Sequence, residues 1–292
     1  MKILVIGGTG FIGSYVVRQL QQTGHEVTVF HRGFHESELL TGIRHIHSAE
    51  ANIPVVAFPG DLLSESFEVV IHMIAMGERD ARAAVRAFAG RSRRLVILSS
   101  GDVYLAYGRF MKTEPGPIEA GLLTEDSPLR TVHFPYRSQA QATNELNYFY
   151  EKILVEREVS GHGAIESTIL RLPKVYGPGQ NANLATVYSF RDAPDWRWTH
   201  GYVENVASAV VLAALHRAAA NRLYNIGELY TPTVSERLKL LPETPANILP
   251  ADKEAYDLRQ DIAFDTRRIR QELGYDESCG YEEGLRRTLA SQ

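Results

Sequence analysis

The stretch "GGTGFIG" at residues 7–13 limits most strongly what this chain can fold into. It contains two overlapping patterns, Gly8-x-Gly10-x-x-Gly13 and Gly7-x-x-Gly10-x-x-Gly13. The apolar run "KILVI" precedes it, and residues 11–24 follow with apolar side chains at helical spacing. Glycines between a strand and a helix allow a tight turn in which a pyrophosphate rests on the helix N-terminus. The pattern therefore predicts a dinucleotide-binding turn; a glycine turn without a ligand is the alternative.

The rest of the first 172 residues alternates between expected strands and helices. Helices are expected at 77–90 and 147–158, and strands at 26–30, 43–47, 68–74, 94–100 and 166–172. Such alternation favours an α/β fold with a Rossmann-type, doubly wound parallel sheet. After residue 172 the alternation breaks. We expect an NAD(P)-binding domain from 1–172 plus 201–228, and a smaller C-terminal substrate-binding lobe from 173–200 plus 229–292.

Composition narrows the class of protein. Of the 292 residues, 44% are hydrophobic and 23% charged, as in ordinary globular proteins, and the net charge of −4 gives no basic footprint for nucleic acid. The longest apolar run, 206–215, is too short for a membrane span, and "ILVI" is too short for a signal peptide. A single cysteine, Cys279, excludes an internal disulfide. We expect a cytoplasmic protein that binds no membrane.

The end of the second expected strand bears on the choice of cofactor. An NAD-binding unit usually has Asp or Glu about 20 residues past the glycines, where it holds the ribose 2′-hydroxyl. Here His31 stands at that position and Arg32 follows. A guanidinium suits a 2′-phosphate, so we expect NAD(P)(H) as cofactor, with NADP(H) favoured over NAD(H). The alternative is that Arg32 points to solvent and that Glu36 or a backbone group holds the ribose.

Two further patterns carry chemistry. "SSGDVY" (99–104) closes the fifth expected strand at the carboxyl edge of the sheet, where open α/β folds bind ligands. Tyr148 precedes Lys152 by four residues, so on one continuous helix the two side chains would share a face. Tyr150 would lie on another face. The alternative is that Tyr148 and Lys152 are two residues of an ordinary amphipathic helix.

Together these motifs resemble the extended short-chain dehydrogenase/reductases, the NAD(P)-dependent epimerase/dehydratase family. The later segments "ILRLPKVYGPG", "GYVENVASAV" and "RLYNIGE" resemble it too. The resemblance implies a catalytic set of Ser100, Tyr148 and Lys152. Tyr148 would exchange a proton with a substrate alcohol, Ser100 would hold the same oxygen, and Lys152 would lower the pKa of the phenol and bind the nicotinamide ribose.

The expected contacts follow the strand ends and the glycine turn. The cofactor contacts are expected at Gly7, Gly10, Phe11, Ile12, Gly13, His31, Arg32, Ile74, Ala75, Ser99, Lys152 and Leu172. Substrate contacts are expected at Asp102 and Lys174, the latter with an anionic group. No metal site is expected, because His31 and His35 flank a glycine and His45 and His47 alternate on a strand.

These features favour an NAD(P)-dependent oxidoreductase or epimerase that acts on a secondary alcohol or ketone, as in a nucleotide sugar. A non-catalytic NAD(P)-binding redox sensor or RNA-associated protein is the alternative. Dehydratases of the family carry two acids directly after the catalytic hydroxyl, and here Gly101 replaces the first. The charges on the helices at 77–90 (Arg79, Arg82, Arg86) and 143–160 (Glu145, Glu151, Glu156, Glu158) favour a homodimer through these helices.

Overall fold

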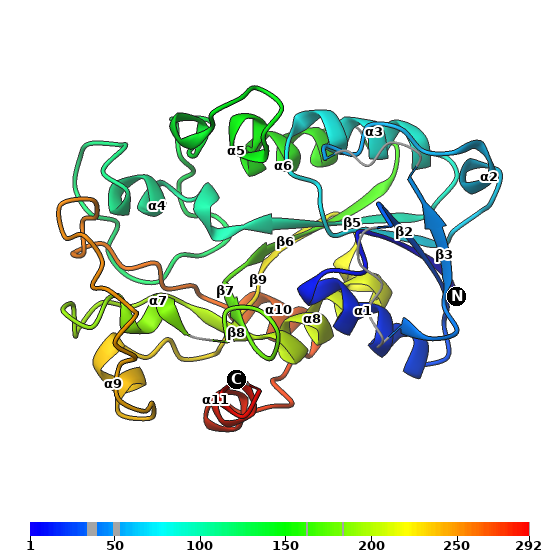
Figure 1. Cartoon of the computed structure of the whole chain (residues 1–292). Coiled ribbons are helices and arrows are strands. Elements are labelled where there is room, and N and C mark those ends of the chain that lie inside the picture. Colours follow the sequence, from blue (N-terminus) through cyan, green and yellow to red (C-terminus); the bar gives the residue numbers. More distant parts are fainter. Residues whose placement is uncertain (34–39, 49–52, 162, 183, 292) are drawn as a thin grey trace. The chain divides into compact units, whose positions relative to one another are not determined.

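The structure is a computed structural model that describes residues 1–33, 40–48, 53–161, 163–182 and 184–291 (Figure 1). The chain divides into two compact units. Unit 1 comprises 1–100, 133–171 and 207–224, and unit 2 comprises 101–132, 172–206 and 225–292. Residues 101–132, counted with the larger domain from the sequence, thus lie in unit 2.

Unit 1 is built on a seven-stranded sheet with the order β3-β2-β1-β4-β5-β6-β9. Its strands are β1 (Lys2–Ile6), β2 (Glu26–His31), β3 (Arg44–His47), β4 (Val69–His72), β5 (Arg94–Ser100), β6 (Glu166–Leu172) and β9 (Arg222–Asn225). The β1–β2, β1–β4, β2–β3 and β4–β5 pairs are parallel. This confirms the predicted α/β sheet.

Helices cover both faces of this sheet. They are α1 (Phe11–Gln22), α2 (Gly60–Leu63), α3 (Glu78–Phe88), α5 (Leu146–Phe149), α6 (Lys152–Ser160) and α8 (Val203–Leu215). Figure 1 shows α3 and α6 on one face and α1 and α8 on the other. Successive strand residues alternate between the two cores, so Leu4 and Ile6 pack with Val85 of α3 and Val155 of α6.

Unit 2 has a small sheet and short helices. Its two strands, β7 (Lys174–Tyr176) and β8 (His200–Tyr202), run parallel with Lys174 opposite His200. Its helices are α4 (Leu105–Phe110), α7 (Ala185–Tyr188), α9 (Val234–Leu238), α10 (Arg267–Leu273) and α11 (Tyr281–Leu289). Unit 2 also has a short 3₁₀ turn at Gly101–Val103, whereas those at Arg137–Gln139 and Arg217–Ala219 belong to unit 1. Within the described residues, no helix is long and apolar enough to cross a bilayer.

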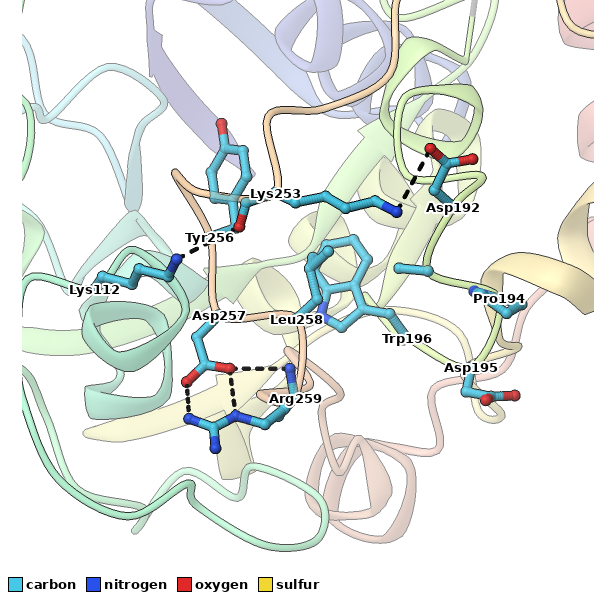
Figure 2. A pocket seen from close by; sticks show the side chains of 11 residues that line it. Lys112, Asp192, Pro194, Asp195, Trp196, Lys253, Tyr256, Asp257, Leu258 and Arg259 are labelled. Atoms are coloured by element: carbon cyan, nitrogen blue, oxygen red, sulfur yellow. Dashed lines mark hydrogen bonds and ion pairs between the residues drawn. The ribbon is translucent and has the colours of Figure 1, made fainter.

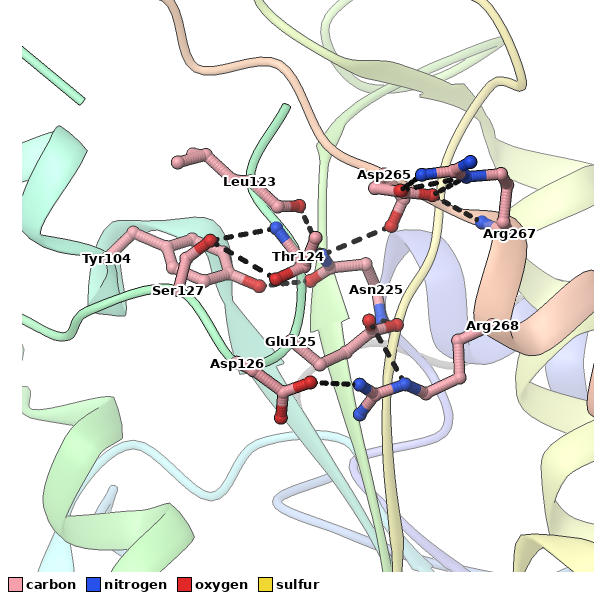
Figure 3. A network of polar contacts seen from close by, with 10 residues as sticks. All are labelled: Tyr104, Leu123, Thr124, Glu125, Asp126, Ser127, Asn225, Asp265, Arg267 and Arg268. Atoms are coloured by element: carbon pink, nitrogen blue, oxygen red, sulfur yellow. Dashed lines mark hydrogen bonds and ion pairs between the residues drawn. The ribbon is translucent and has the colours of Figure 1, made fainter. Parts of the chain in front are cut away.

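A network of polar contacts joins four segments of unit 2, at residues 104, 123–127, 225 and 265–268 (Figure 3). The hydroxyl of Tyr104 donates to the side-chain oxygen of Asn225 at 2.5 Å, and the amide nitrogen of Asn225 donates to the Leu123 carbonyl at 2.8 Å. Arg268 of α10 lies 3.4 Å from the Glu125 carboxylate, whose pKa is raised by burial. Tyr104 of the "SSGDVY" motif is fully buried, so its role here is structural.

Candidate active site

The glycine turn between β1 and α1 is as tight as the sequence predicts. Gly7 has a φ of +79°, and its N–H donates to the Phe30 carbonyl of β2 at 2.8 Å. A Cβ at Gly7 would lie 2.8 Å from the Ile74 side chain, and one at Gly13 would lie 2.8 Å from the Gly7 carbonyl oxygen. Both positions therefore require glycine, one for its backbone angle and both for lack of space.

Gly10 differs from the other two because the space beside it is open. A Cβ there would approach only the Gly7 carbonyl oxygen, at 4.0 Å. Gly10 is also the N-cap of α1, where none of the described side chains caps the helix and the first turn holds no acid. The N–H groups at the start of α1, which include those of Phe11 and Ile12, therefore receive no capping hydrogen bond from a side chain of the described residues. This cradle fits the pyrophosphate of a dinucleotide cofactor.

The side chain of His31, at the end of β2, is held within the protein. Its Nδ1 accepts from the Gly33 N–H at 3.2 Å, so Nε2 carries the proton and donates to His45 Nδ1 at 2.9 Å. The imidazole also packs against His47 and is buried. Arg32 follows on the exposed side of the strand end. Glu36, the alternative ribose partner, lies outside the described residues.

The two serines that end β5 face different surroundings. The Ser99 hydroxyl is buried and donates to the Glu156 carboxylate at 2.5 Å. Arg171 of β6 binds the same carboxylate through two nitrogens, at 2.9 and 2.8 Å. Ser100 is half-buried at the last position of β5. Ser99 therefore ties α6 to the sheet, which leaves Ser100 as the motif's candidate for a substrate contact.

The predicted continuous helix over 147–158 is wrong. Helix α5 ends at Phe149 and α6 begins at Lys152, with Tyr150 at ψ 118° and Glu151 at φ −159° and ψ 99°, both extended. Tyr148 and Lys152 therefore do not lie on one helix. The neighbour rule for residues four apart does not place their side chains together here.

Contacts of Glu151 account for the interruption. Its buried carboxylate caps α6 by accepting from the Ile153 N–H at 3.0 Å, and it also accepts from the Phe134 N–H at 2.5 Å. The Glu151 N–H donates to the Met76 carbonyl at 2.9 Å. These hydrogen bonds satisfy the backbone N–H groups and the carboxylate at the interruption. In a continuous helix the same groups would need other partners.

The two tyrosines near the interruption have different partners. The ring centroid of Tyr148 lies 4.7 Å from the guanidinium carbon of Arg137, and Arg137 Nε donates to the Tyr148 carbonyl at 2.9 Å. The ring centroid of Tyr150 lies 5.6 Å from Lys152 Nζ and 5.2 Å from the ring centroid of Tyr136. The structure thus brings Lys152 to Tyr150, the tyrosine expected on another face. In the sequence, the only sign of this contact is that an aromatic residue stands two positions before Lys152.

Lys152 is held at the carboxyl edge of the sheet. Its ammonium donates to the carbonyl of Ala75, just after β4, at 2.5 Å and to that of Leu98 in β5 at 2.9 Å. Burial and, to a smaller extent, the charge of Lys152 lower the pKa of His72 to about 3. Burial also raises the pKa of Asp80, while Lys152 and three backbone N–H groups oppose that rise. Lys152 is the shared electrostatic neighbour of these groups.

The predicted substrate residues lie in unit 2. Lys174 begins β7 and is half-buried, with its Nζ 5.9 Å from the ring centroid of Trp198. Burial lowers its pKa, and no carboxylate of the described residues forms an ion pair with it. Asp102 is buried in the 3₁₀ turn, where its carbonyl accepts from Arg130. Leu172, predicted to touch the cofactor, is half-buried at the end of β6.

A pocket of about 560 Å³ lies within unit 2 (Figure 2). Its walls combine Trp196 and Tyr256 with charged side chains, several of which are paired. Arg259 binds Asp257 at 2.7 Å, and Lys253 lies 3.8 Å from Asp192. Among the described residues, none of those predicted to bind cofactor or substrate lines this pocket.

Comparison with known proteins decides the family. The sequence profile described as "NAD dependent epimerase/dehydratase family" matches residues 3–227. The chain belongs to the NAD-dependent epimerase/dehydratase family. The predicted resemblance is confirmed, and the protein is an NAD-dependent enzyme of this family. Family membership is consistent with the open cradle at Gly10.

Individual relatives of this epimerase/dehydratase are distant. A dTDP-glucose 4,6-dehydratase from Actinoplanes sp. is 25% identical, with 99% of this chain and 97% of that protein aligned. A UDP-glucose 4-epimerase from Corynebacterium glutamicum is also 25% identical, over 94% of this chain and 90% of its own. The solved structure of the Thermotoga maritima UDP-glucose 4-epimerase with UDP-glucose superposes with a TM-score of 0.71 at 21% identity, covering 100% of this chain and 98% of that one.

Proposed function

We propose that this enzyme transfers hydride to and from a secondary alcohol or ketone carbon of a nucleotide sugar. One observation carries the proposal: the Lys152 ammonium is fixed on the Ala75 and Leu98 carbonyls at the carboxyl edge of the sheet that also bears the glycine turn. Open α/β folds bind ligands at that edge. The relatives named for UDP-glucose and dTDP-glucose chemistry support a nucleotide sugar.

The roles of the chain's residues follow from where they lie. When bound, the nicotinamide cofactor supplies the hydride chemistry. Ser100 holds the substrate oxygen by a hydrogen bond, and a phenol takes the proton from that oxygen or returns it. The spacing in the sequence predicts Tyr148 as that phenol, but the ammonium of Lys152 lies over the ring of Tyr150. Lys152 supplies a fixed positive charge, which favours the ionised phenol.

Epimerisation or reduction is favoured over dehydration because of Gly101. Dehydration in this family is expected to use an acid directly after the catalytic hydroxyl. In the structure a Cβ at Gly101 would overlap the ring of Phe264, which is itself fully buried. Any side chain at this position would therefore displace Phe264. Transient oxidation and re-reduction of one carbon needs no such acid.

For the cofactor, we propose a preference for NADP(H), carried by the exposed Arg32 and the absence of a carboxylate at the position of His31. A fluorescence titration should show tighter binding of NADPH than NADH, and Arg32→Ala should narrow the difference. Several-fold tighter binding of NADH by the wild type would overturn this preference, but not the proposed reaction.

The proposed function is tested with a panel of UDP- and dTDP-sugars. Purified protein is incubated with each sugar and with NAD or NADP, and products are separated by chromatography while cofactor absorbance is followed at 340 nm. We expect an epimer, or a keto product with stoichiometric cofactor reduction, from at least one sugar. Tight cofactor binding without conversion of any sugar would show that the protein does not have this function.

A further inference from the structure

Lys152 has a tyrosine near its ammonium, but it is not the one that the four-residue spacing selects. The ring of Tyr150 has its centroid 5.6 Å from Lys152 Nζ. Tyr148 lies in α5, before the interruption, and its ring faces Arg137. The positive charge of Lys152, which could favour ionisation of a phenol, is therefore beside Tyr150.

The position of Lys152 is fixed from the sheet side. Two of the three ammonium hydrogens are directed at the carbonyls of Ala75 and Leu98. The side chain is 4% exposed, and Glu156, one turn later in α6, is fastened to Arg171 and Ser99. Lys152 therefore has little freedom to move toward Tyr148.

The interruption that separates the two tyrosines is fixed as well. Glu151 bonds to Ile153, Phe134 and Met76, as described above. In addition, a Cβ at Gly77 would lie 2.7 Å from the Phe149 carbonyl oxygen, so the end of α5 packs directly on the start of α3. Rejoining α5 and α6 into one helix would break these contacts together.

Tyr148 has a different environment. Arg137 lies over two rings, with its guanidinium carbon 3.5 Å from the centroid of Phe134 and 4.7 Å from that of Tyr148. Phe134 adopts a φ of +59°, which is unusual for a bulky residue. The Tyr148 ring is thus part of the packing that holds residues 134–148 together.

We propose that Tyr150, and not Tyr148, is the phenol that exchanges the proton with the substrate oxygen, assisted by Lys152. This inference rests on the proposed hydride-transfer function. In the oxidative direction the Tyr150 phenolate takes the proton of the substrate hydroxyl, and a bound nicotinamide cofactor would supply the acceptor for the carbon-bound hydride. In the reductive direction the phenol returns its proton to the carbonyl oxygen. Tyr148 positions Arg137 and the segment before α5.

Other ionisable groups also lie near Lys152 or Tyr150. Asp80 and His72 both interact electrostatically with Lys152, and burial disfavours the charged form of each. Glu151 adjoins Tyr150 in sequence, but its carboxylate accepts backbone hydrogen bonds from Phe134 and Ile153. Lys152 is therefore the cation in this group that acts on the Tyr150 ring.

The first test measures phenol ionisation and needs no substrate. Tyrosine ionisation is followed by ultraviolet difference absorbance against pH in the wild type, Tyr150→Phe, Tyr148→Phe and Lys152→Met, with the Tyr150 transition identified as the one lost in Tyr150→Phe. We expect Lys152→Met to move that transition to higher pH by about one unit or more. The transition lost in Tyr148→Phe should stay in place. An unchanged Tyr150 transition in Lys152→Met would overturn the pairing.

The second test measures turnover of a sugar that the wild type converts. Tyr150→Phe should lower kcat and kcat/KM together by about 10²-fold or more, whereas Tyr148→Phe should keep both within about threefold. NADH binding and thermal melting of each variant check that the fold is retained. Loss of turnover in Tyr148→Phe with activity kept in Tyr150→Phe would overturn the inference. If the wild type converts no sugar, the proposed function fails, and the titration still decides the pairing.

Discussion

Lys174 is the residue whose surroundings best indicate a ligand in unit 2. It is a half-buried cation over the Trp198 ring, and none of the described carboxylates pairs with it. We expect it to bind an anionic group of the substrate. Lys174→Ala should raise KM by about 10- to 100-fold, the usual size of a charge-assisted hydrogen bond. Lys239→Ala, which removes an exposed lysine of the same unit, is the matched control and should leave KM unchanged.

The pH dependence of substrate binding should report the same residue. Burial lowers the pKa of Lys174, so its ammonium loses the proton at a lower pH than an exposed lysine does. Affinity for the anion should therefore be full below this pKa and fall as the pH rises through it. In Lys174→Arg the guanidinium stays charged, so the fall should move to higher pH. Identical KM–pH profiles for the wild type and Lys174→Arg would exclude Lys174 from binding.

Gly101 is a residue whose lack of a side chain is required by its surroundings. Because its Cβ would overlap the Phe264 ring, Gly101→Ala should lower the free energy of unfolding by about 1–3 kcal/mol, as overpacking does. The control is Gly60→Ala, where nothing lies within 4 Å of the added Cβ. Denaturant unfolding measures both. Equal stability of Gly101→Ala and the wild type would show that Phe264 moves aside freely, and would reopen the question of an acid at position 101.

At the scale of elements, the placement of α6 depends on one buried ion pair. Glu156 receives two bonds from Arg171 of β6 and one from Ser99 of β5. Arg171→Met would leave the Glu156 carboxylate buried without its cation, which typically costs about 3–5 kcal/mol of stability.

A double-mutant cycle separates this cost from the packing of the side chains. Arg171→Met combined with Glu156→Gln should be closer in stability to the wild type than Arg171→Met alone, because no unpaired charge remains. On the exposed face of α11, Arg286→Met breaks a surface pair with Glu283 and should change stability by less than about 1 kcal/mol. Additive losses in the double mutant would mean that Arg171 acts through packing alone.

At the scale of the whole molecule, the charge argument for a homodimer loses part of its support. Arg82 of α3 bonds to Glu158 of α6 within the same chain, at 3.1 and 3.2 Å, while Glu151 and Glu156 are buried. These four charged residues are therefore used inside one chain. We still propose a homodimer, by analogy with related enzymes, and expect it to be insensitive to salt. Sedimentation at micromolar concentration in low and high salt measures this; a mass near 32.6 kDa would contradict it.

The first strand, the glycine turn and the first helix could be predicted from the sequence because their causes are local. A β-branched run, four glycines and an apolar helical stripe follow one another within 24 residues, and each acts on its own neighbours. The parallel sheet was predictable for the same reason, since every strand carries its own pattern. The glycine pattern alone predicted that Gly10 contacts a ligand, without knowledge of the open space beside it.

The tyrosine beside Lys152 could not be assigned in this way. Local spacing favours one helix through 147–158, but the interruption is caused by Glu151 bonding to Met76 and Phe134, which lie 75 and 17 positions earlier in the chain. The same holds for Gly101, whose constraint comes from Phe264, and for His31, whose imidazole is held by His45. The sequence by itself determined the family, the sheet and the residues able to do the chemistry. Only the tertiary structure decided which of them meet, because hydrogen bonds and packing between distant segments override local helical preference.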